Sequence, residues 1–392
     1  MSAQTAMIGR PTSDLETPVL LVDLDAFERN VARMRQVIIG EAGIGWRPHT
    51  KGIKTPALAH KLLQAGALGV TCAKLGEAEV MAAAGVRDIL IANEVVGASK
   101  VARLVRLARH ADIVVGVDGE EQVEALDRAA RDAGTRLRVV VEVNVAVNRA
   151  GVEPGEPAVA LARRVATCEG LRFAGLMGWE GGGIAGLRDP VEKRRAIEAA
   201  VGRLTGSAER CRAAGLPVDI VSCGGTGTYW ISAKLPGVTE VQAGGGVFGD
   251  AHYRTNYGVD HECALTILTT VISRPTPTRI VCDAGWKSMA RVPMLPEPLR
   301  VGEVKSLAVS AEHATLELAR PDATPRVGDR LEFVAGYSDA TVFLHDDLYG
   351  VRDGRLEVIW PILGRGRPGR SRPWPIPERE PPPSASPSRG PA

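Results

Sequence analysis

The 392-residue sequence lacks the features that would assign it at once to a class of binding proteins. It has 48 basic and 46 acidic side chains, so its net charge is only +2. No strong field therefore favours nucleic acid or an anionic membrane as a partner. No apolar run approaches the roughly 20 residues that a membrane-spanning helix requires, and the first residues lack the apolar core of a signal peptide. We expect no nucleic acid and no membrane as partners.

Paired cysteines and aromatic residues are scarce as well. The six cysteines show no short paired spacing and are Cys72, Cys168, Cys211, Cys223, Cys263 and Cys282. This pattern argues against a zinc knot or a disulfide framework and favours a reducing compartment. Aromatic residues make up only 4%, which suits a core of alanine, valine and leucine. We expect a cytoplasmic, enzyme-like chain that is long enough for two domains.

What the chain does contain is a regular alternation of short apolar strands with helices. The intervening segments are rich in alanine, leucine and arginine and place apolar residues at helical spacing, as at Pro56–Ala65 and Glu121–Ala133. The eight predicted strands are Trp46–Thr50, Gly69–Ala73, Asp88–Ala92, Asp112–Val117, Leu137–Val143, Arg172–Met177, Val218–Ser222 and Glu240–Ala243. Eight strands separated by helices indicate an α/β fold, a (β/α)8 TIM-type barrel rather than an open doubly wound sheet.

From about His261 the pattern changes to β-like segments with turns at proline, glycine and aspartate. We place the barrel domain at 17–257 and a second, mostly antiparallel β-domain at 258–364. The strand-like run Val19–Val22 precedes the barrel, and the β-domain is its alternative location. Residues 1–16 are expected to form a loose leader. Residues 365–392, rich in proline and arginine, are expected to form a disordered tail.

One lysine lies at a position suited to chemistry. In the stretch Gly45–Pro56, GWRPHTKGIKTP, a run ends at Thr50 and Lys51, and a helix is predicted from about Thr55. Lys51 would therefore lie where a strand gives way to a loop, the face that carries active sites in parallel α/β proteins. We interpret Lys51 as a lysine that forms a Schiff base with pyridoxal 5'-phosphate (PLP). The alternative is a solvated lysine at the end of a strand.

Two glycine-rich loops follow the seventh and eighth predicted strands. They are Ser222–Thr228, SCGGTGT, and Ala243–Gly249, AGGGVFG. Successive glycines let backbone amides converge on an anion, and barrels often bind a ligand's phosphate in these two loops. Flexible turns are the alternative. Together with Lys51, the loops favour a phosphorylated cofactor bearing an aldehyde, because a lysine Schiff base turns that aldehyde into an electron sink.

Several motifs carry a resemblance to a known family. They run in order along almost the whole chain and are TPVLLVDLD (Thr17–Asp25), RPHTK (Arg47–Lys51), GEAEV (Gly76–Val80), DILIANEVVG (Asp88–Gly97), NRAGV (Asn148–Val152), LRFAGLMGWEG (Leu171–Gly181), GGTGTY (Gly224–Tyr229), TEVQAG (Thr239–Gly244), DAGWK (Asp283–Lys287) and WPILGRG (Trp360–Gly366). On these motifs the chain resembles the fold-type III PLP enzymes, specifically the D-threonine aldolase and D-serine dehydratase-like family with an alanine racemase-like barrel.

The resemblance implies a role for individual residues. Lys51 would bind PLP covalently, and Arg149 would lie near the cofactor ring and its phenolic oxygen. Trp179 stands at the position where the family usually has a tyrosine near the substrate, so the resemblance implies that Trp179 would contact the substrate. The residues that would hold the phosphate are Gly225, Thr226, Gly227, Thr228, Gly245 and Gly246. The family also implies a head-to-tail homodimer in which β-domain residues complete the neighbouring site.

The sequence departs from the family at the expected metal site. Relatives typically hold a divalent metal with a His-X-Cys or His-X-Asp pair, but here Tyr337 replaces the histidine and only Asp339 remains. Two further expected histidines are replaced by Ile53 and Gly182. Tight zinc sites use three or four protein ligands, so we expect no tightly bound metal. Asp339 would at most hold hydrated Mg²⁺ or Mn²⁺ weakly.

The missing histidine bears on the reaction. Elimination of hydroxide needs an acid, whereas retro-aldol cleavage needs a base for the β-hydroxyl proton. His49 and Tyr337 are candidate bases, although a phenol with an unperturbed pKa of about 10 would need help to ionise. Alternatively, His49 only positions the cofactor and Tyr337 only packs in the site.

We therefore predict a PLP-dependent aldolase, a carbon–carbon lyase that acts on D-configured β-hydroxy-α-amino acids in the cleavage direction or its reverse. Its partners would be small-molecule amino acids and aldehydes. The first alternative is a PLP-dependent dehydratase of the same substrates. Others are an amino-acid racemase or epimerase using Lys51 and Tyr337, and a PLP-binding protein without turnover.

Overall fold

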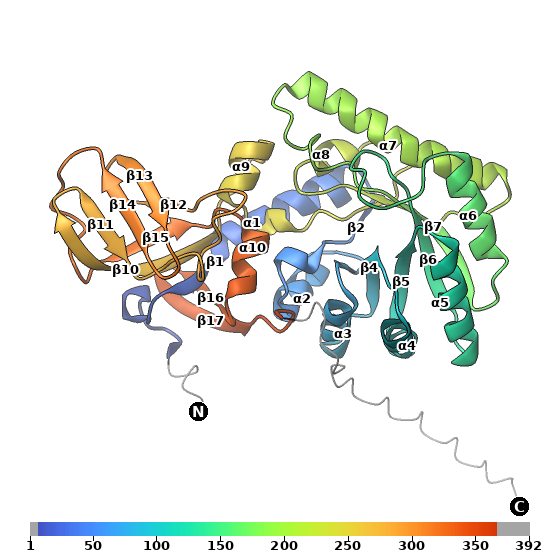
Figure 1. Ribbon diagram of the computed structural model, residues 1–392, viewed down its shortest axis with the longest axis horizontal. Helices are drawn as coiled ribbons and strands as arrows, with labels where there is room; N and C mark the ends of the chain where they lie inside the picture. The colour runs from blue at the N-terminus through green and yellow to red at the C-terminus, as the bar shows by residue number, and fades with distance from the viewer. Residues whose placement is uncertain (1–6, 367–392) are drawn as a thin grey trace, which may run out of the picture.

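The computed structural model describes residues 7–366, and two sheets dominate it (Figure 1). The first has eight parallel strands in the order β2-β9-β8-β7-β6-β5-β4-β3. These are β2 Gly45–Trp46, β3 Val70–Cys72, β4 Asp88–Glu94, β5 Asp112–Val117, β6 Leu137–Glu142, β7 Leu171–Met177, β8 Ile220–Cys223 and β9 Glu240–Val241. A parallel bridge between His49 and Thr71 joins the two ends of this order. The predicted eight-stranded barrel is confirmed.

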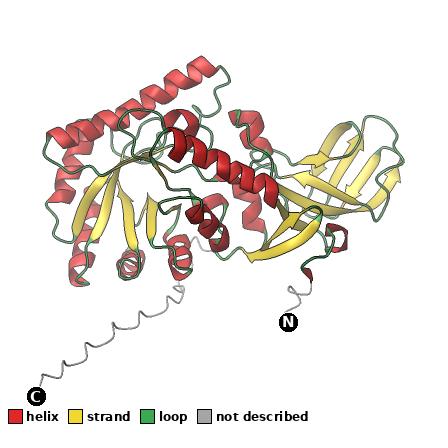
Figure 2. Ribbon diagram, turned by 180° about the vertical axis from the view of Figure 1, so that it is seen from behind, coloured by secondary structure: helices red, strands yellow, loops and turns green. Residues whose placement is uncertain are grey.

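Helices cover the outside of the barrel, as Figures 1 and 2 show from opposite sides. They are α2 Pro56–Gln64, α3 Leu75–Ala83, α4 Ala98–Leu107, α5 Glu120–Asp132, α6 Glu156–Ala166, α7 Pro190–Ala213 and α8 Tyr229–Ser232. Helix α9, Ala251–Tyr257, lies instead toward the β-domain, where its first N–H groups donate to the carbonyl oxygens of Ala335 and Gly336. Apolar residues at helical spacing face the strands; in α5, for example, Val123, Leu126 and Ala130 are buried. Among residues 7–366, no helix is both long and apolar enough to cross a membrane.

The strand that leads to Lys51 is shorter than predicted. The regular strand β2 ends at Trp46, and residues Thr50–Gly52 form the 3-10 helix η4. Pro48 has no N–H group to donate to a ladder. The backbone N–H groups of Arg47 and His49 nevertheless donate to carbonyl oxygens at the end of β9, both at 2.9 Å. The segment therefore still follows the barrel wall as far as His49.

A second, mixed and mostly antiparallel sheet lies beside the barrel (Figure 1). Its strands are β1 Val19–Asp23, β10 Leu265–Thr276, β11 Arg279–Cys282, β12 Glu297–Leu299, β13 Val304–Val309, β14 Ala314–Leu318, β15 Arg330–Val334, β16 Asp347–Arg352 and β17 Arg355–Pro361. β1 pairs with β10 and with β16, so the first strand joins the β-domain, as the alternative prediction had it. The boundary at 257/258 stays a prediction; strands replace the β/α alternation between α9 and β10.

Residues 7–16 correct the prediction of a loose leader. The N–H of Gly9 donates to the carbonyl oxygen of Leu356 at 2.7 Å, and the N–H of Leu356 donates to Arg10 at 2.9 Å. Leu15 is fully buried in an apolar cluster with Val19 and other β-domain residues. This apolar side chain and the pairing with β17 hold the segment in place. Residues 1–6 of the predicted leader, and the predicted tail from 367 on, lie outside the described residues.

Helix α1, Leu24–Arg35, connects the β-domain to the barrel and continues as the π-helix η3, Gln36–Glu41. Asp23 caps it by accepting from the N–H of Ala26 at 2.9 Å. The buried amide of Asn30 donates to the carbonyl oxygen of Val247 at 3.2 Å. Val247 ends the 3-10 helix η5, Gly245–Val247, in the second glycine-rich loop. Helix α1 thus supports that loop from behind.

Candidate active site

A cavity of about 400 Å³ lies at the carboxyl ends of the barrel strands. This volume falls within the roughly 300–1,000 Å³ typical of small-molecule sites. The predicted site residues that line it are His49, Lys51, Arg149, Trp179, Gly225, Thr226, Gly227, Thr228, Gly245 and Tyr337. A second cavity of about 290 Å³ is lined by Asp339 and again by Lys51. The fold therefore brings residues from six separate segments of the chain to one place.

A buried arginine holds the strand that leads to Lys51. Arg47 is only 2% exposed, and it donates to Glu240 at 2.9 Å and to Asp88 at 2.6 Å. These two ion pairs join the segment after β2 to β9 and β4. Just before the lysine, the hydroxyl of Thr50 donates to Glu77 at 2.7 Å. Both interactions fix the start of η4, so the backbone at Lys51 has a defined position.

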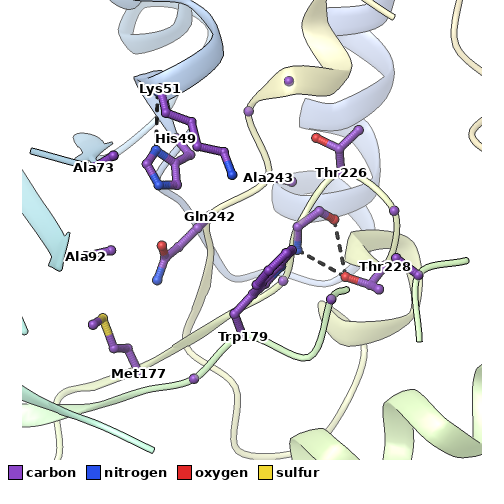
Figure 3. Close-up of a pocket in the computed structure, with 18 of the residues that line it drawn as sticks. His49, Lys51, Ala73, Ala92, Met177, Trp179, Thr226, Thr228, Gln242 and Ala243 are labelled. Atoms are coloured by element: carbon purple, nitrogen blue, oxygen red, sulfur yellow. Dashed lines mark hydrogen bonds between the residues drawn. The ribbon is translucent and has the colours of Figure 1, made fainter. Parts of the chain in front are cut away.

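The side chain of Lys51 reaches into the cavity toward Trp179. Its Nζ lies 5.6 Å from the centre of the Trp179 ring, and the guanidinium carbon of Arg149 lies 5.5 Å from the same ring. Both distances suit cation–π attraction. Figure 3 shows Lys51 and His49 on one side of the cavity and Thr226 and Thr228 on the other, with Trp179 between them.

His49 lies beside Lys51 as a neutral imidazole. Burial lowers its pKa well below the usual value, and the charges of Lys51, Lys54 and Arg149 lower it further. Its Nδ1 accepts a hydrogen bond from the backbone N–H of Lys51 at 3.3 Å (Figure 3). In a neutral ring whose Nδ1 accepts, the hydrogen is on Nε2. This arrangement orders the loop at Lys51 and leaves no lone pair on the ring for a substrate proton.

The two glycine-rich loops form a cup of backbone donors. Within the described part of the chain, the N–H groups of Thr226, Gly227 and Gly245 have no hydrogen-bond partner. The N–H of Gly246 instead donates to the hydroxyl of Thr226 at 3.0 Å, which joins the two loops. A Cβ on Gly245 would lie 2.6 Å from the hydroxyl oxygen of Tyr253. The cup therefore suits an anion of the size of phosphate.

A fully buried carboxylate, Glu180, braces the first of these loops. It accepts from the N–H of Gly224 at 3.1 Å and from the hydroxyls of Thr228 and Ser232 at 2.6 and 2.5 Å. The hydroxyl hydrogen of Thr228 is thus donated to Glu180 rather than directed at the cup. Sequence reasoning missed Glu180; an acidic residue inside the glycine run after a barrel strand was its only signal.

A second acidic pair that sequence reasoning missed lies at the ends of β4 and β6. Glu142 is 3.5 Å from a guanidinium nitrogen of Arg149. Burial and then the neighbouring Glu94 raise the pKa of Glu142 to about 8, against the opposite effect of Arg149. An oxygen of Glu94 is buried without a partner among the described residues. A proton on Glu142 could be donated to this oxygen of Glu94, and the Glu94–Glu142 pair would then carry one negative charge instead of two beside Arg149.

Tyr337 and Asp339 approach Lys51 from the β-domain, around the short helix α10, Ser338–Thr341. The hydroxyl of Tyr337 donates to Oδ2 of Asp339 at 3.1 Å. The same carboxylate oxygen lies 3.6 Å from Nζ of Lys51. Burial and then the charge of Asp339 raise the pKa of Tyr337. The phenol therefore stays protonated and acts as a donor, which disfavours the predicted role of Tyr337 as a base.

The residues around Asp339 do not fit a tightly held metal ion. Within residues 7–366, no group of three or more histidine, cysteine, aspartate or glutamate side chains is arranged to hold one. The second carboxylate oxygen of Asp339, Oδ1, is buried and packs against Gly52. Nearby His252 is hydrogen-bonded through Nδ1 to Asn256 at 2.7 Å. The donor set near Asp339 is therefore a single carboxylate oxygen and a phenol.

Comparisons with known proteins agree with this geometry. The family model described as the alanine racemase N-terminal domain matches residues 22–252, and that of a putative serine dehydratase domain matches residues 264–351. A D-threonine aldolase of Arthrobacter sp. is 35% identical over 364 residues, which cover 92% of this chain and 96% of the relative. A 3-hydroxy-D-aspartate aldolase of Paracoccus denitrificans is 35% identical over 375 residues, covering 92% and 95%.

Among solved structures, D-threonine aldolase from Filomicrobium marinum matches with a TM-score of 0.89 and 38% identity over 94% of this chain and 100% of that one. A D-threo-3-hydroxyaspartate dehydratase of Delftia sp. is 35% identical over 281 residues, 71% of this chain and 73% of the relative. Barrel, β-domain and lysine-bearing cavity thus define a protein of the alanine racemase-like class. Within it, the chain belongs to the family that includes D-threonine aldolase and the serine dehydratase-like proteins, which confirms the resemblance.

Proposed function

We propose that the protein is a PLP-dependent aldolase that cleaves D-configured β-hydroxy-α-amino acids into an aldehyde and a smaller amino acid, or runs the reverse reaction. One observation carries the proposal: Lys51 lines the same cavity as the backbone amides of Thr226, Gly227 and Gly245, which have no hydrogen-bond partner among residues 7–366. The aldolases of Arthrobacter and Paracoccus, each 35% identical over most of this chain, support the reaction class.

The cavity fits PLP by its own chemistry. The amide cup would hold the phosphate, Lys51 would hold the aldehyde carbon, and Arg149 would face the ring from the β6 side. When bound, PLP supplies an electron sink for the pair released at the substrate's α-carbon. His49 fixes the loop at Lys51, and Trp179 forms the apolar wall between Lys51 and Arg149. The protein's task is to orient the bond that breaks and to move one proton.

The first experiment asks whether Lys51 carries the cofactor. Purified protein incubated with PLP should be yellow, and borohydride reduction followed by peptide mass spectrometry should find the cofactor on Lys51. The Lys51→Ala variant should show no adduct. The matched control Lys54→Ala, which removes a lysine that lines only the second cavity, should keep it. A covalent adduct that persists in Lys51→Ala would refute the assignment.

A dehydratase of the same substrates is the second candidate, because Tyr337 is a protonated donor near Lys51 that could assist a departing hydroxide. Product analysis separates the two. D-Threonine, D-phenylserine and D-3-hydroxyaspartate should each yield an aldehyde or its equivalent together with glycine. Keto acid and ammonia instead would establish the dehydratase, and loss of optical rotation alone would establish a racemase.

We also propose a cytoplasmic homodimer. The six cysteines form no disulfides, which supports a reducing compartment. Between β11 and β12 the β-domain exposes Trp286 and Val292, 44% and 69% accessible, and such apolar residues suit a protein interface. Light scattering on the purified protein should give twice the 41.5 kDa chain mass. A monomer at micromolar concentration would contradict the dimer.

A further inference from the structure

We propose that Asp339 is the catalytic base of this aldolase and that the enzyme works without a divalent metal, with Tyr337 and Lys51 as the partners of the carboxylate. This inference rests on the proposed function, because it assigns the acceptor of the substrate's β-hydroxyl proton. It departs from the metal dependence that the family resemblance implies.

The carboxylate of Asp339 is placed at the reacting position. Its Oδ2 is 3.6 Å from Nζ of Lys51 and 3.1 Å from the hydroxyl oxygen of Tyr337, and the side chain is 11% exposed. Lys51 Nζ marks where the substrate's amino group must arrive. The β-hydroxyl is on the carbon next to the α-carbon, so an oxygen at this distance from Nζ is within its reach.

Asp339 is held there by contacts on both sides. Toward the barrel, a Cβ on Gly52 would overlap with Oδ1 and lie 3.0 Å from the carboxylate carbon, so no other residue type fits at 52 without moving Asp339. Toward the β-domain, the N–H and hydroxyl of the preceding Ser338 both donate to the buried Asp250 at 2.8 Å. Because both sides are fixed, the carboxylate is preorganised.

The same contacts leave no place for a metal at Asp339. Oδ1 is enclosed by Gly52, and Oδ2 already accepts a hydrogen bond from the hydroxyl of Tyr337. A divalent cation at Oδ2 would have to displace that phenol and lie beside Nζ of Lys51, which is 3.6 Å from the same oxygen. Other carboxylates near the lysine are engaged: Glu77 accepts from Thr50 at 2.7 Å and from the N–H of Ala73 at 3.0 Å. With one available oxygen, the site falls short of the ligand count of a tight metal site.

The proton and electron counts of the step close without a metal. The β-hydroxyl proton passes to Oδ2 of Asp339, and the electrons of the O–H bond form the second bond of the aldehyde carbonyl. The Cα–Cβ bond breaks, and its pair stays with the α-carbon. One proton then returns from the Asp339–Tyr337 pair to the α-carbon, so that glycine and an aldehyde leave and Asp339 is again a carboxylate.

The metal half of the inference can be tested without turnover. Purified protein dialysed against EDTA and then titrated with Mn²⁺ should bind less than one tenth of an equivalent at 100 µM, measured by elemental analysis after gel filtration. Tyr337→His, which restores a His-X-Asp pair, should bind at least tenfold more Mn²⁺. Stoichiometric Mn²⁺ or Zn²⁺ in the unmodified protein would overturn the inference, whatever the activity proves to be.

The base is tested by kinetics on the PLP-loaded enzyme. EDTA treatment should change kcat less than twofold. Asp339→Asn should keep the colour of bound PLP and KM within threefold while kcat falls at least 100-fold, and Tyr337→Phe should lower kcat about tenfold. Glu312→Gln, at an exposed ion pair with Lys287 in the β-domain, is the control. Aldolase activity abolished by EDTA and restored by Mn²⁺, or an Asp339→Asn enzyme within threefold of the parent, would overturn the inference while the proposed function stands.

Discussion

Replacing the buried Glu180 should loosen the phosphate loop and destabilise the barrel together. The carboxylate is 0% exposed and accepts three hydrogen bonds within 3.1 Å. In Glu180→Ala, two donors have second partners: the hydroxyl of Thr228 lies 3.3 Å from the oxygen of Gly225, and that of Ser232 lies 3.3 Å from the oxygen of Thr228. The N–H of Gly224 has none. We therefore expect unequal losses from the three bonds.

The magnitude follows from these contacts. A buried N–H left without an acceptor costs about 1–3 kcal/mol, and a hydrogen bond to a charged group contributes about 1.5–3 kcal/mol before the hydroxyls find their second partners. The loss should therefore total about 3–5 kcal/mol for Glu180→Ala. Glu180→Gln keeps one acceptor oxygen but points an NH₂ group at one donor, so it should lose about 1–2 kcal/mol.

Denaturant unfolding of the PLP-free protein measures these values, and a PLP titration measures the loop. We expect the dissociation constant of PLP to rise at least tenfold in Glu180→Ala, because Gly225 and Thr226 lose their fixed conformation. Glu312→Ala, which breaks a 57%-exposed ion pair, should change stability by less than about 1 kcal/mol. An unfolding free energy within 1 kcal/mol of the parent together with unchanged PLP affinity would refute the reasoning.

Two further predictions concern the barrel. A Cβ at Gly244 would overlap with the carbonyl of His49 and lie 2.6 Å from its backbone nitrogen, so Gly244→Ala should destabilise the protein by about 3 kcal/mol. The control Gly202→Ala, in α7 with open space around it, should instead stabilise the protein by about 1 kcal/mol. Equal effects of the two substitutions in denaturant unfolding would contradict the clash. Because the folded pKa of Glu142 is about 8 against an ordinary 4.5, the contribution of its proton to stability should be fully present below pH 4.5 and be lost as pH rises through 8, by up to roughly 4 kcal/mol. Glu142→Gln should flatten this part of the pH dependence of stability, and an unchanged slope would exclude Glu142 as its source.

The local pattern was sufficient for much of the architecture. All eight predicted barrel strands overlap observed ones, because short apolar runs between amphipathic helices have few alternatives in a parallel sheet. Lys51 and the two glycine-rich loops were found because each follows a strand, and parallel strands bring their carboxyl ends to one rim. The resemblance extended this to Arg149, Trp179 and the position of Tyr337.

Other features depend on residues far apart in the chain. The sequence around Leu15 did not predict that this side chain is buried, because Leu268 and Leu356 of its apolar cluster lie more than 250 positions further along the chain. Glu180, Glu94 and Glu142 read as ordinary acidic residues until the barrel buries them against specific donors or against each other. Burial, unlike residue type, is a property of the closed fold.

The amino-acid sequence by itself determined the barrel, the lysine at its rim and the family. Only the tertiary structure decided how the lysine is partnered, because Asp339 and Tyr337 come from the other domain, nearly 290 residues along the chain. Packing against Gly52 aims one carboxylate oxygen at Lys51 and encloses the other. That geometry, set by contacts between two domains, is what distinguishes a base from a metal ligand here.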